Sequence, residues 1–210
     1  MVEKSRPYHY GELGSALVEA GLVLARAGGP DALRLREVTR SVGVSPSAAY
    51  RHFSDQRALV IAVAQRAQDL LANAMIDRME SGQERTGSVD RALARLRGVG
   101  LGYINFAVTE PGWFALAILT FDEPANNNST VTTKGQVPPP YQLLLNALDG
   151  MLDAGVITSQ QRLHAEWSCW SAVHGFADLA TRGPLQTQSR TTIDYLAAHV
   201  VNTAIQGIRT

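Results

Sequence analysis

The chain has 210 residues, and its 19 basic and 19 acidic residues give a formal net charge of zero. Hydrophobic residues make up 45% of the chain and charged residues 18%, which excludes a largely disordered protein and provides for a buried core. The single cysteine, Cys169, excludes a disulfide scaffold. No run reaches about 18 uninterrupted apolar residues, and residues 1–12 lack the apolar core of a signal peptide. We therefore expect a cytoplasmic protein with no membrane span.

Apolar residues recur at helical spacing along nearly the whole chain, so the sequence predicts an all-α fold. Nine helices are expected, at about 13–28, 36–42, 46–53, 55–81, 89–110, 113–121, 141–154, 158–181 and 193–208. Gly28-Gly29-Pro30 is a helix stop signal, and Thr158 with Gln161 resembles a capping box. Residues 122–140 are polar and rich in Asn and Pro, which is typical of a binding loop, a lid or a disordered segment.

The segment 33–59 carries the most informative pattern. Two short helices are joined by a turn at Gly43, which is the layout of a helix-turn-helix. Val38, Val42 and Val44 are expected to hold the first helix against the second, from which Ala49 and Phe53, four residues apart, face inward. The sequence pair Ser45-Pro46 supplies an N-cap and a proline at the first helical position.

The outer surface of this motif suits DNA. Arg36 can reach a guanine edge with two hydrogen bonds, and Tyr50 and His52 can donate to phosphates. The capped helix start presents backbone N–H groups to a phosphate, and the small Ala48 lets the helix approach a groove. The residues expected on the DNA-facing surface are Arg36, Ser45, Ser47, Ala48, Tyr50, Arg51 and His52.

Residues 10–75 resemble the N-terminal domain of TetR-family transcriptional regulators. The resemblance rests on an apolar first helix followed by Gly43-Val44-Ser45, Tyr50, His52-Phe53 and Leu59. It implies a homodimer on a palindromic double-stranded DNA operator, usually a repressor that a small molecule releases. It also implies DNA contacts at Arg36, Ser47, Ala48, Tyr50, His52 and Gln56.

Two positions depart from the family pattern. The family often has lysine where Gln56 stands, and the neighbouring Arg57 is expected to supply the phosphate contact instead. The family often has Ile-Ala where Val38-Thr39 stands. We regard the second change as mild, because the hydroxyl of Thr39 can bond back within its helix.

The C-terminal part resembles one TetR ligand-domain subfamily, which is named WHG for its Trp, His and Gly. The stretches that carry this resemblance are 103–107, 110–114 and Trp170 with His174-Gly175. Nearly all aromatic residues outside the DNA-binding part lie between 103 and 176. Each alone is typical of core packing, but together they can line an apolar cavity for a small hydrophobic effector. The predicted ligand-binding residues are Tyr103, Phe106, Trp113, Phe114, Phe121, Trp167, Trp170 and His174.

No motif for a metal, a cofactor or catalysis stands out. The glycines of 98–102 lack the preceding strand and the spacing of a phosphate loop. Cys169 is expected to be a small buried hydrophobe. His174 is expected to brace neighbouring helices, to anchor a ligand or to belong to the dimer contact. Two alternatives remain open: a helical enzyme using His174, Asp178 or Glu110, and a helical adaptor that does not bind DNA.

We therefore predict a two-domain regulator that is not an enzyme. Residues 1–57 would form the DNA-binding domain and 58–210 the ligand-binding and dimerisation domain, with a long helix at about 55–81 linking them. The wide apolar faces of the last two helices suggest a homodimeric four-helix bundle, although burial within one chain is the alternative. A ligand would shift the long helix and move the two DNA-binding domains out of register.

Overall fold

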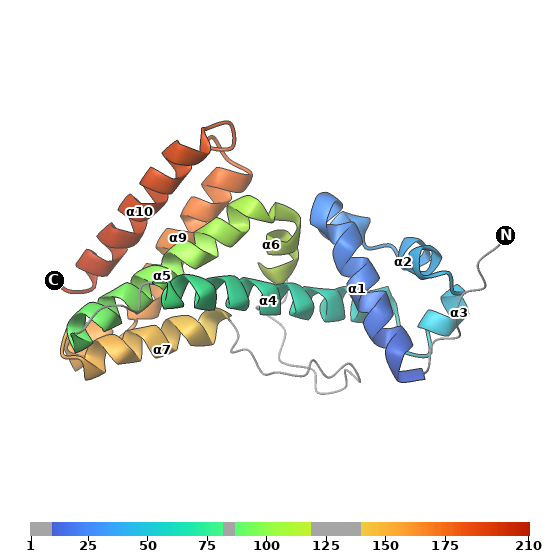
Figure 1. Cartoon of the computed structure of the whole chain (residues 1–210), viewed down its shortest axis with the longest axis horizontal. Helices are drawn as coiled ribbons and strands as arrows, with labels where there is room; N and C mark the ends of the chain where they lie inside the picture. Colours follow the sequence, from blue (N-terminus) through green and yellow to red (C-terminus); the bar gives the residue numbers. More distant parts are fainter. Residues whose placement is uncertain (1–9, 82–86, 119–139) are drawn as a thin grey trace. The chain divides into compact units, whose positions relative to one another are not determined.

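The computed structural model describes residues 10–81, 87–118 and 140–210, with side chains from Glu12 onward. Over these ranges the chain forms ten α-helices, one short 3₁₀ helix and no strand (Figure 1). The predicted all-α fold is therefore confirmed. The helices are α1 (Tyr10–Gly28), η1 (Gly29–Ala32), α2 (Leu35–Val42), α3 (Pro46–Ala49), α4 (Gln56–Glu80), α5 (Ser88–Thr109), α6 (Pro111–Ile118), α7 (Pro140–Asp153), α8 (Ser159–Arg162), α9 (Ala165–Thr181) and α10 (Arg190–Gly207). None of the described helices is long and apolar enough to cross a membrane.

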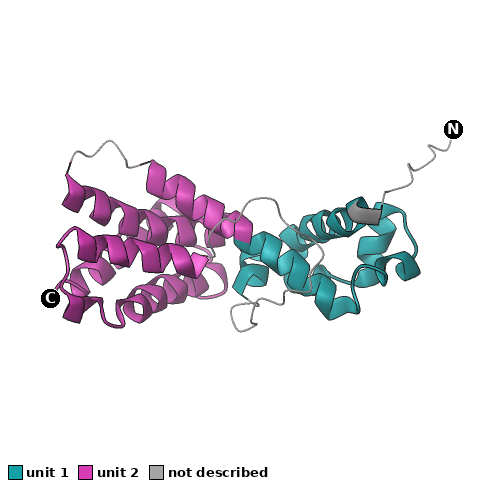
Figure 2. Ribbon diagram, turned by 90° about the horizontal axis from the view of Figure 1, so that it is seen from below, with its two compact units in different colours: residues 1–68, 110–136 teal, residues 69–109, 137–210 magenta. Residues whose placement is uncertain are grey.

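The chain divides into two compact units (Figure 2). Unit 1 comprises 1–68 and 110–136, so it contains α1 to α3, the first half of α4, and α6. Unit 2 comprises 69–109 and 137–210, and contains the second half of α4, α5 and α7 to α10. Unit 1 thus extends beyond the 1–57 range expected for the DNA-binding domain, because it continues along α4 and includes α6.

Unit 1 is built around α1, which contacts η1, α2, α3 and α6. Leu17 of α1, Val38 of α2 and Leu59 of α4 are completely buried in its core. Gly21 of α1 lies so close to α4 that an added Cβ atom would stand 2.7 Å from Cγ2 of Val63. Gly21 thus permits the close packing of α1 against α4.

Unit 2 is a helical bundle in which α5 contacts α7, α9 and α10, and α9 also contacts α7 and α10. Tyr103 and Ile104 of α5 and Leu148 and Met151 of α7 are buried in its core. Of the predicted ligand residues, Tyr103, Phe106, Trp167, Trp170 and His174 belong to this bundle, whereas Trp113 and Phe114 belong to unit 1.

The predicted single helix over 158–181 is wrong, because the chain breaks it into α8 and α9. Leu163 is extended, and His164 has the left-handed backbone conformation, with φ 61° and ψ 14°. No glycine or proline marks this position, so helical spacing alone does not reveal it. The capping box of Thr158 and Gln161 at the start of α8 is confirmed.

Candidate DNA-binding surface and effector cavity

The turn of the helix-turn-helix depends on one glycine. Gly43 follows α2 with φ 75° and ψ 29°, a left-handed conformation that residues with a side chain rarely adopt. Its N–H donates to the carbonyl of Arg40, and the N–H of Val44 donates to that of Thr39 at 3.0 Å. These bonds satisfy carbonyl groups at the end of α2 and redirect the chain into α3.

The second helix of the motif is shorter than predicted. Ser45 is the N-cap, and its hydroxyl accepts from the N–H of Ala48 at 3.3 Å. α3 is a single turn that ends at Ala49, so the predicted helix end near Phe53 is wrong. The N–H of Phe53 still donates to the carbonyl of Ala49 at 3.0 Å, so the chain after α3 continues as hydrogen-bonded turns.

The inner face of the motif is packed as the spacing predicts. Val38, Ala49 and Phe53 are buried, which holds α2 against α3 and the segment after it. Thr39 is buried as well, and its hydroxyl donates to the carbonyl of Arg36 at 3.1 Å. The expected back-bonding of Thr39 is therefore confirmed, and its buried hydroxyl has a hydrogen-bond partner.

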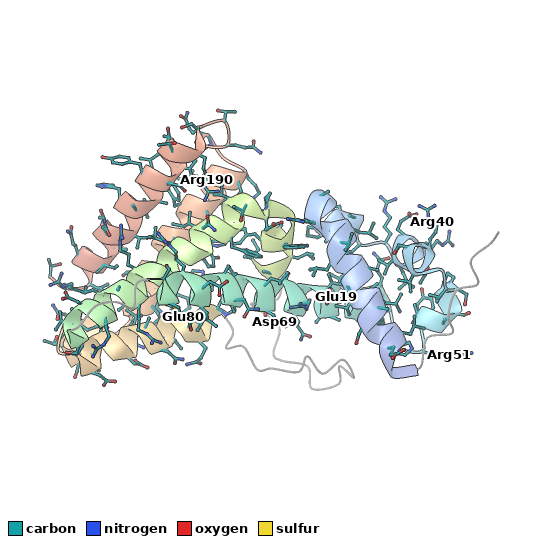
Figure 3. The ribbon with its side chains drawn as sticks, viewed as in Figure 1. Glu19, Arg40, Arg51, Asp69, Glu80 and Arg190 are labelled. Atoms are coloured by element: carbon teal, nitrogen blue, oxygen red, sulfur yellow. The ribbon has the colours of Figure 1, made fainter. Side chains whose placement is uncertain are left out.

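The outer face carries every residue predicted to contact DNA. Arg36, Ser45, Ser47, Tyr50, Arg51, Gln56 and Arg57 are exposed, while Ala48 and His52 are half-buried. Tyr50 has 55% of its surface exposed. Figure 3 shows Arg40 and Arg51 in this part of unit 1. Sequence reasoning did not select Arg40, which forms an ion pair with Glu37 on the same helix.

Unit 1 also contains Trp113, which the sequence predicts as a ligand-binding residue of the C-terminal domain. The indole N–H of Trp113 on α6 donates to the carbonyl of Leu22 on α1 at 2.7 Å. The guanidinium of Arg26 makes two hydrogen bonds to the carboxylate of Glu110, and lies 4.9 Å from the centre of the Trp113 ring. The Glu110 carboxylate raises the pKa of Arg26 by hydrogen bonding and by charge. Trp113 thus anchors α6 to α1 and lies in unit 1.

Unit 2 holds an apolar cavity of about 30 Å³, bounded by α4, α5, α7, α9 and α10. Tyr103 and Trp170 line it, as do aliphatic residues such as Val173, Val201 and Ile205. A drug-sized ligand needs roughly 300–1,000 Å³, so this cavity must widen before such a molecule can enter.

A polar pair lies beside the cavity wall. The hydroxyl of Tyr103 lies 2.8 Å from Nδ1 of His174, and burial raises the pKa of Tyr103. The Trp170 ring stands 5.7 Å from the Tyr103 ring and 5.4 Å from the Tyr141 ring. Tyr103 and Trp170 of this aromatic cluster line the cavity, and Tyr103 connects it to His174 behind them.

The other predicted ligand residues do not line this cavity. Phe106 and Phe114 are buried in α5 and α6, whereas Trp167 on α9 is 60% exposed and lies 6.3 Å from the Tyr141 ring. Phe121 lies outside the described residues. The aliphatic lining was missed because helical spacing marks a core residue and a cavity residue in the same way.

Cys169 also lines the cavity, and its expected burial is confirmed. Burial is the main reason that the pKa of its thiol is raised to about 11, and the nearby Glu166 carboxylate adds to the effect. The thiol is therefore protonated at neutral pH, which is the state expected of a packing residue.

Comparisons with known proteins agree with this geometry. Residues 17–63 match a model of bacterial regulatory proteins of the tetR family, and residues 96–204 match a tetracyclin repressor-like C-terminal domain. No curated protein matches the sequence. A protein of unknown function from Rhodococcus sp. RHA1 has a similar structure, with a TM-score of 0.73, 25% identity, and coverage of 98% of this chain and 100% of that one.

Two further solved structures share the fold at lower identity. A TetR transcriptional regulator from Streptomyces coelicolor has a TM-score of 0.63 and 15% identity, over 93% of this chain and 96% of that one. The regulator FadR from Bacillus subtilis, in complex with stearoyl-CoA, has a TM-score of 0.58 and 14% identity, over 92% and 98%. The second family model alone spans more than half of the chain, and the helix-turn-helix matches the first. The chain therefore belongs to the TetR family and is a DNA-binding transcriptional regulator, not an enzyme.

Proposed function

We propose that the protein is a homodimeric repressor that binds a palindromic operator and is released by a small hydrophobic effector. The observation that carries this proposal is that one chain holds both an exposed helix-turn-helix surface and an apolar cavity, in separate compact units. The continuous helix α4 contributes to both units. Action on chromosomal DNA would place the protein in the cytoplasm.

The proposed operator contacts come from the outer face of the motif. Arg36 would read a base edge, and Ser45, Ser47, Tyr50, Arg51, His52, Gln56 and Arg57 would position the motif on phosphates. The half-buried Ala48 would let α3 approach the floor of the major groove. In a dimer, two such surfaces would occupy half-sites about 34–36 Å apart, or a multiple of that distance.

The exposed face of α9 supports the proposed dimer through the last two helices. Leu179 on α9 is 45% exposed, and an interface with a second chain would remove it from water. Gly175 lies between Ser171 and Leu179 on the same side of α9, and an added Cβ atom there would meet nothing within 4 Å. A partner's helices could therefore approach α9 closely, in a four-helix arrangement.

Light scattering tests the dimer. Gly175→Glu places a carboxylate in the proposed interface and should convert the protein to monomers at micromolar concentration. Gly150→Glu is the matched control, because Gly150 on α7 is also a helical glycine with open space around it. A Gly175→Glu protein that remains as dimeric as the control would exclude this interface.

The effector is proposed to be a small, mainly hydrophobic molecule with one polar group. The apolar lining would bind its body, and the Tyr103–His174 pair would bind its polar group once the cavity opens. Trp170, His174 and Gly175 match the Trp, His and Gly for which the WHG subfamily is named, and this match supports the subfamily as part of the proposal. The acyl chain of the stearoyl-CoA bound to FadR is an example of an apolar ligand in this fold.

Release requires a difference in affinity between two states. An effector weakens operator binding only if it binds the released form of the protein more tightly than the DNA-bound form. We assign the transmission to α4, because its first part packs in unit 1 and its second part lines the cavity in unit 2, at Met75.

A reporter assay tests repression and release together. An operator selected from a random duplex pool is placed in the promoter of a reporter gene. Expression should fall when the protein is produced and recover with an apolar effector found by thermal shift. Val173→Phe, which fills the cavity, should still repress but no longer respond. Increased expression would identify an activator, and an unchanged response of Val173→Phe would place the effector elsewhere.

A further inference from the structure

A second site in unit 2 is lined by arginines and polar residues, unlike the apolar cavity. Two adjoining hollows, of about 410 and 390 Å³, run between the end of α4, α5 and α10. Both are lined by Arg78, Arg97 and Leu101. We propose that the hollow formed by Arg78, Arg97 and Arg209 binds the oligophosphate group of a small molecule. We call it the basic hollow.

The closeness of α4 and α5 explains why this hollow exists. An added Cβ atom on Gly98 would lie 2.7 Å from Cα of Met79, and one on Gly102 would lie 2.6 Å from Cα of Met75. The two helix backbones can approach this closely only because both positions are glycine. The glycines of 98–102 that resemble a phosphate loop are thus packing residues. Their effect is to bring Arg78 and Arg97 to one hollow.

The charges in the basic hollow are not balanced by its own lining. Three arginines line it, and none of its lining residues among the described part of the chain carries a carboxylate. Nε of Arg97 donates to the amide oxygen of Asn202 at 2.9 Å, so a neutral group orients it. By contrast, Arg162 and Arg182 elsewhere in unit 2 each form an ion pair with a carboxylate.

The geometry favours phosphate over other anions. The bond from Nε to Asn202 holds the guanidinium plane of Arg97 and leaves its two terminal nitrogens for a bidentate contact. Ser81 and Gln206 add neutral polar groups to the lining. Three positive charges around about 410 Å³ match two or more linked phosphates better than a single carboxylate.

The adjoining hollow contains an arginine that is paired with a carboxylate, and this pair defines the edge of the proposed site. Arg190, labelled in Figure 3, lines it together with Asp194, and Nε of Arg190 donates to that carboxylate at 2.8 Å. This pair neutralises the charge at the far end. The phosphates are therefore placed in the basic hollow, and any further part of the ligand would extend towards Arg190.

Titration calorimetry of the full chain with sodium tripolyphosphate at constant ionic strength tests the proposal. Saturable binding with one site per chain is expected. Arg97→Gln should weaken it about tenfold or more, since a charge-assisted pair of hydrogen bonds is lost. Asn202→Asp should weaken binding to a similar extent, because the new carboxylate would pair with Arg97, although the side chain keeps almost the same shape. Its far-ultraviolet circular dichroism should match that of the wild type.

The control is Arg95→Gln, which removes an exposed arginine from the same helix outside the basic hollow. Its affinity for tripolyphosphate should stay within about twofold of that of the wild type.

Adenosine triphosphate distinguishes two kinds of ligand. Tighter binding than tripolyphosphate indicates a nucleotide, and equal binding indicates the phosphate chain alone. An equal loss in Arg95→Gln would overturn the proposal, because binding would then be diffuse screening. Random duplex DNA provides a second test. If the DNA displaces tripolyphosphate, and if Asn202→Asp also weakens the binding of that DNA, the hollow is a DNA-binding site and the proposal is overturned. Neither result depends on the apolar effector.

Discussion

The hydroxyl of Tyr103 on α5 lies 2.8 Å from Nδ1 of His174 on α9, and Tyr103 is almost completely buried. This contact joins two helices of unit 2 that share the wall of the apolar cavity through Tyr103 and Val173. It gives His174 a role in bracing the helices in the absence of any ligand. We propose that the same pair serves as the polar anchor when the cavity opens, so bracing and ligand binding are compatible roles for His174.

Tyr103→Phe removes this hydrogen bond while keeping the ring. The free energy of unfolding should fall by about 1 kcal/mol. Urea unfolding at one fixed protein concentration measures it, because a dimer's stability depends on concentration. Tyr50→Phe is the control, since more than half of Tyr50 is exposed and it lies outside unit 2 and the proposed dimer helices. Equal stabilities of the two variants would show that the Tyr103–His174 bond contributes nothing.

The buried phenol of Tyr103 also predicts a pH dependence. Burial raises its pKa in the folded protein, whereas an unfolded tyrosine ionises near pH 10. The unfolded chain therefore loses this proton first, and stability should fall as the pH rises above about 10. In Tyr103→Phe that decline should be shallower. An identical alkaline decline in both proteins would mean that Tyr103 does not contribute.

Gly112→Ala should destabilise unit 1. The new Cβ atom would lie 2.3 Å from the carbonyl oxygen of Ala25 and 2.4 Å from that of Arg26, so α6 must move away from α1. Overpacking of this kind costs about 1–3 kcal/mol. Gly150→Ala should instead stabilise by about 0.5–1 kcal/mol, because it fills open space on a helix. Urea unfolding separates the two, and a stable Gly112→Ala protein would contradict the close contact of α6 with α1.

Cys169 should react slowly with iodoacetamide in the native protein at pH 8. Its thiol is buried and its pKa is raised to about 11, so the reactive thiolate is scarce at that pH. Mass spectrometry should show full alkylation only after unfolding in urea. Rapid native alkylation would show instead that the cavity opens readily to solvent.

Much of the fold was predictable because its signals are local. The stop at Gly28-Gly29-Pro30, the cap at Ser45 and the capping box at Thr158 each determine a helix end within a few residues. The packing of Val38, Ala49 and Phe53 followed from helical spacing. The break at His164 was not predictable, because its left-handed backbone carries no glycine or proline signal.

The cavity was harder to predict than the helix-turn-helix. An aromatic residue between 103 and 176 can pack a core, anchor another helix or line a cavity, and sequence spacing does not separate these roles. Trp113 anchors α6 to α1, Trp167 is exposed, and Trp170 lines the cavity. These assignments depend on contacts between helices that are far apart in the sequence. The basic hollow depends in the same way on α4, α5 and α10.

Fluorescence anisotropy on a duplex selected from a random pool, across a salt series, tests whether the outer face of the helix-turn-helix binds an operator. The selected palindrome should bind far more tightly than a scrambled duplex, with affinity that falls steeply as salt rises. Tyr50→Ala should weaken this binding about tenfold, while Val23→Ala, an exposed apolar change on α1 outside the helix-turn-helix, should not. A pool with no enriched sequence, or a Tyr50→Ala protein with wild-type affinity, would contradict the assignment of this surface to the operator.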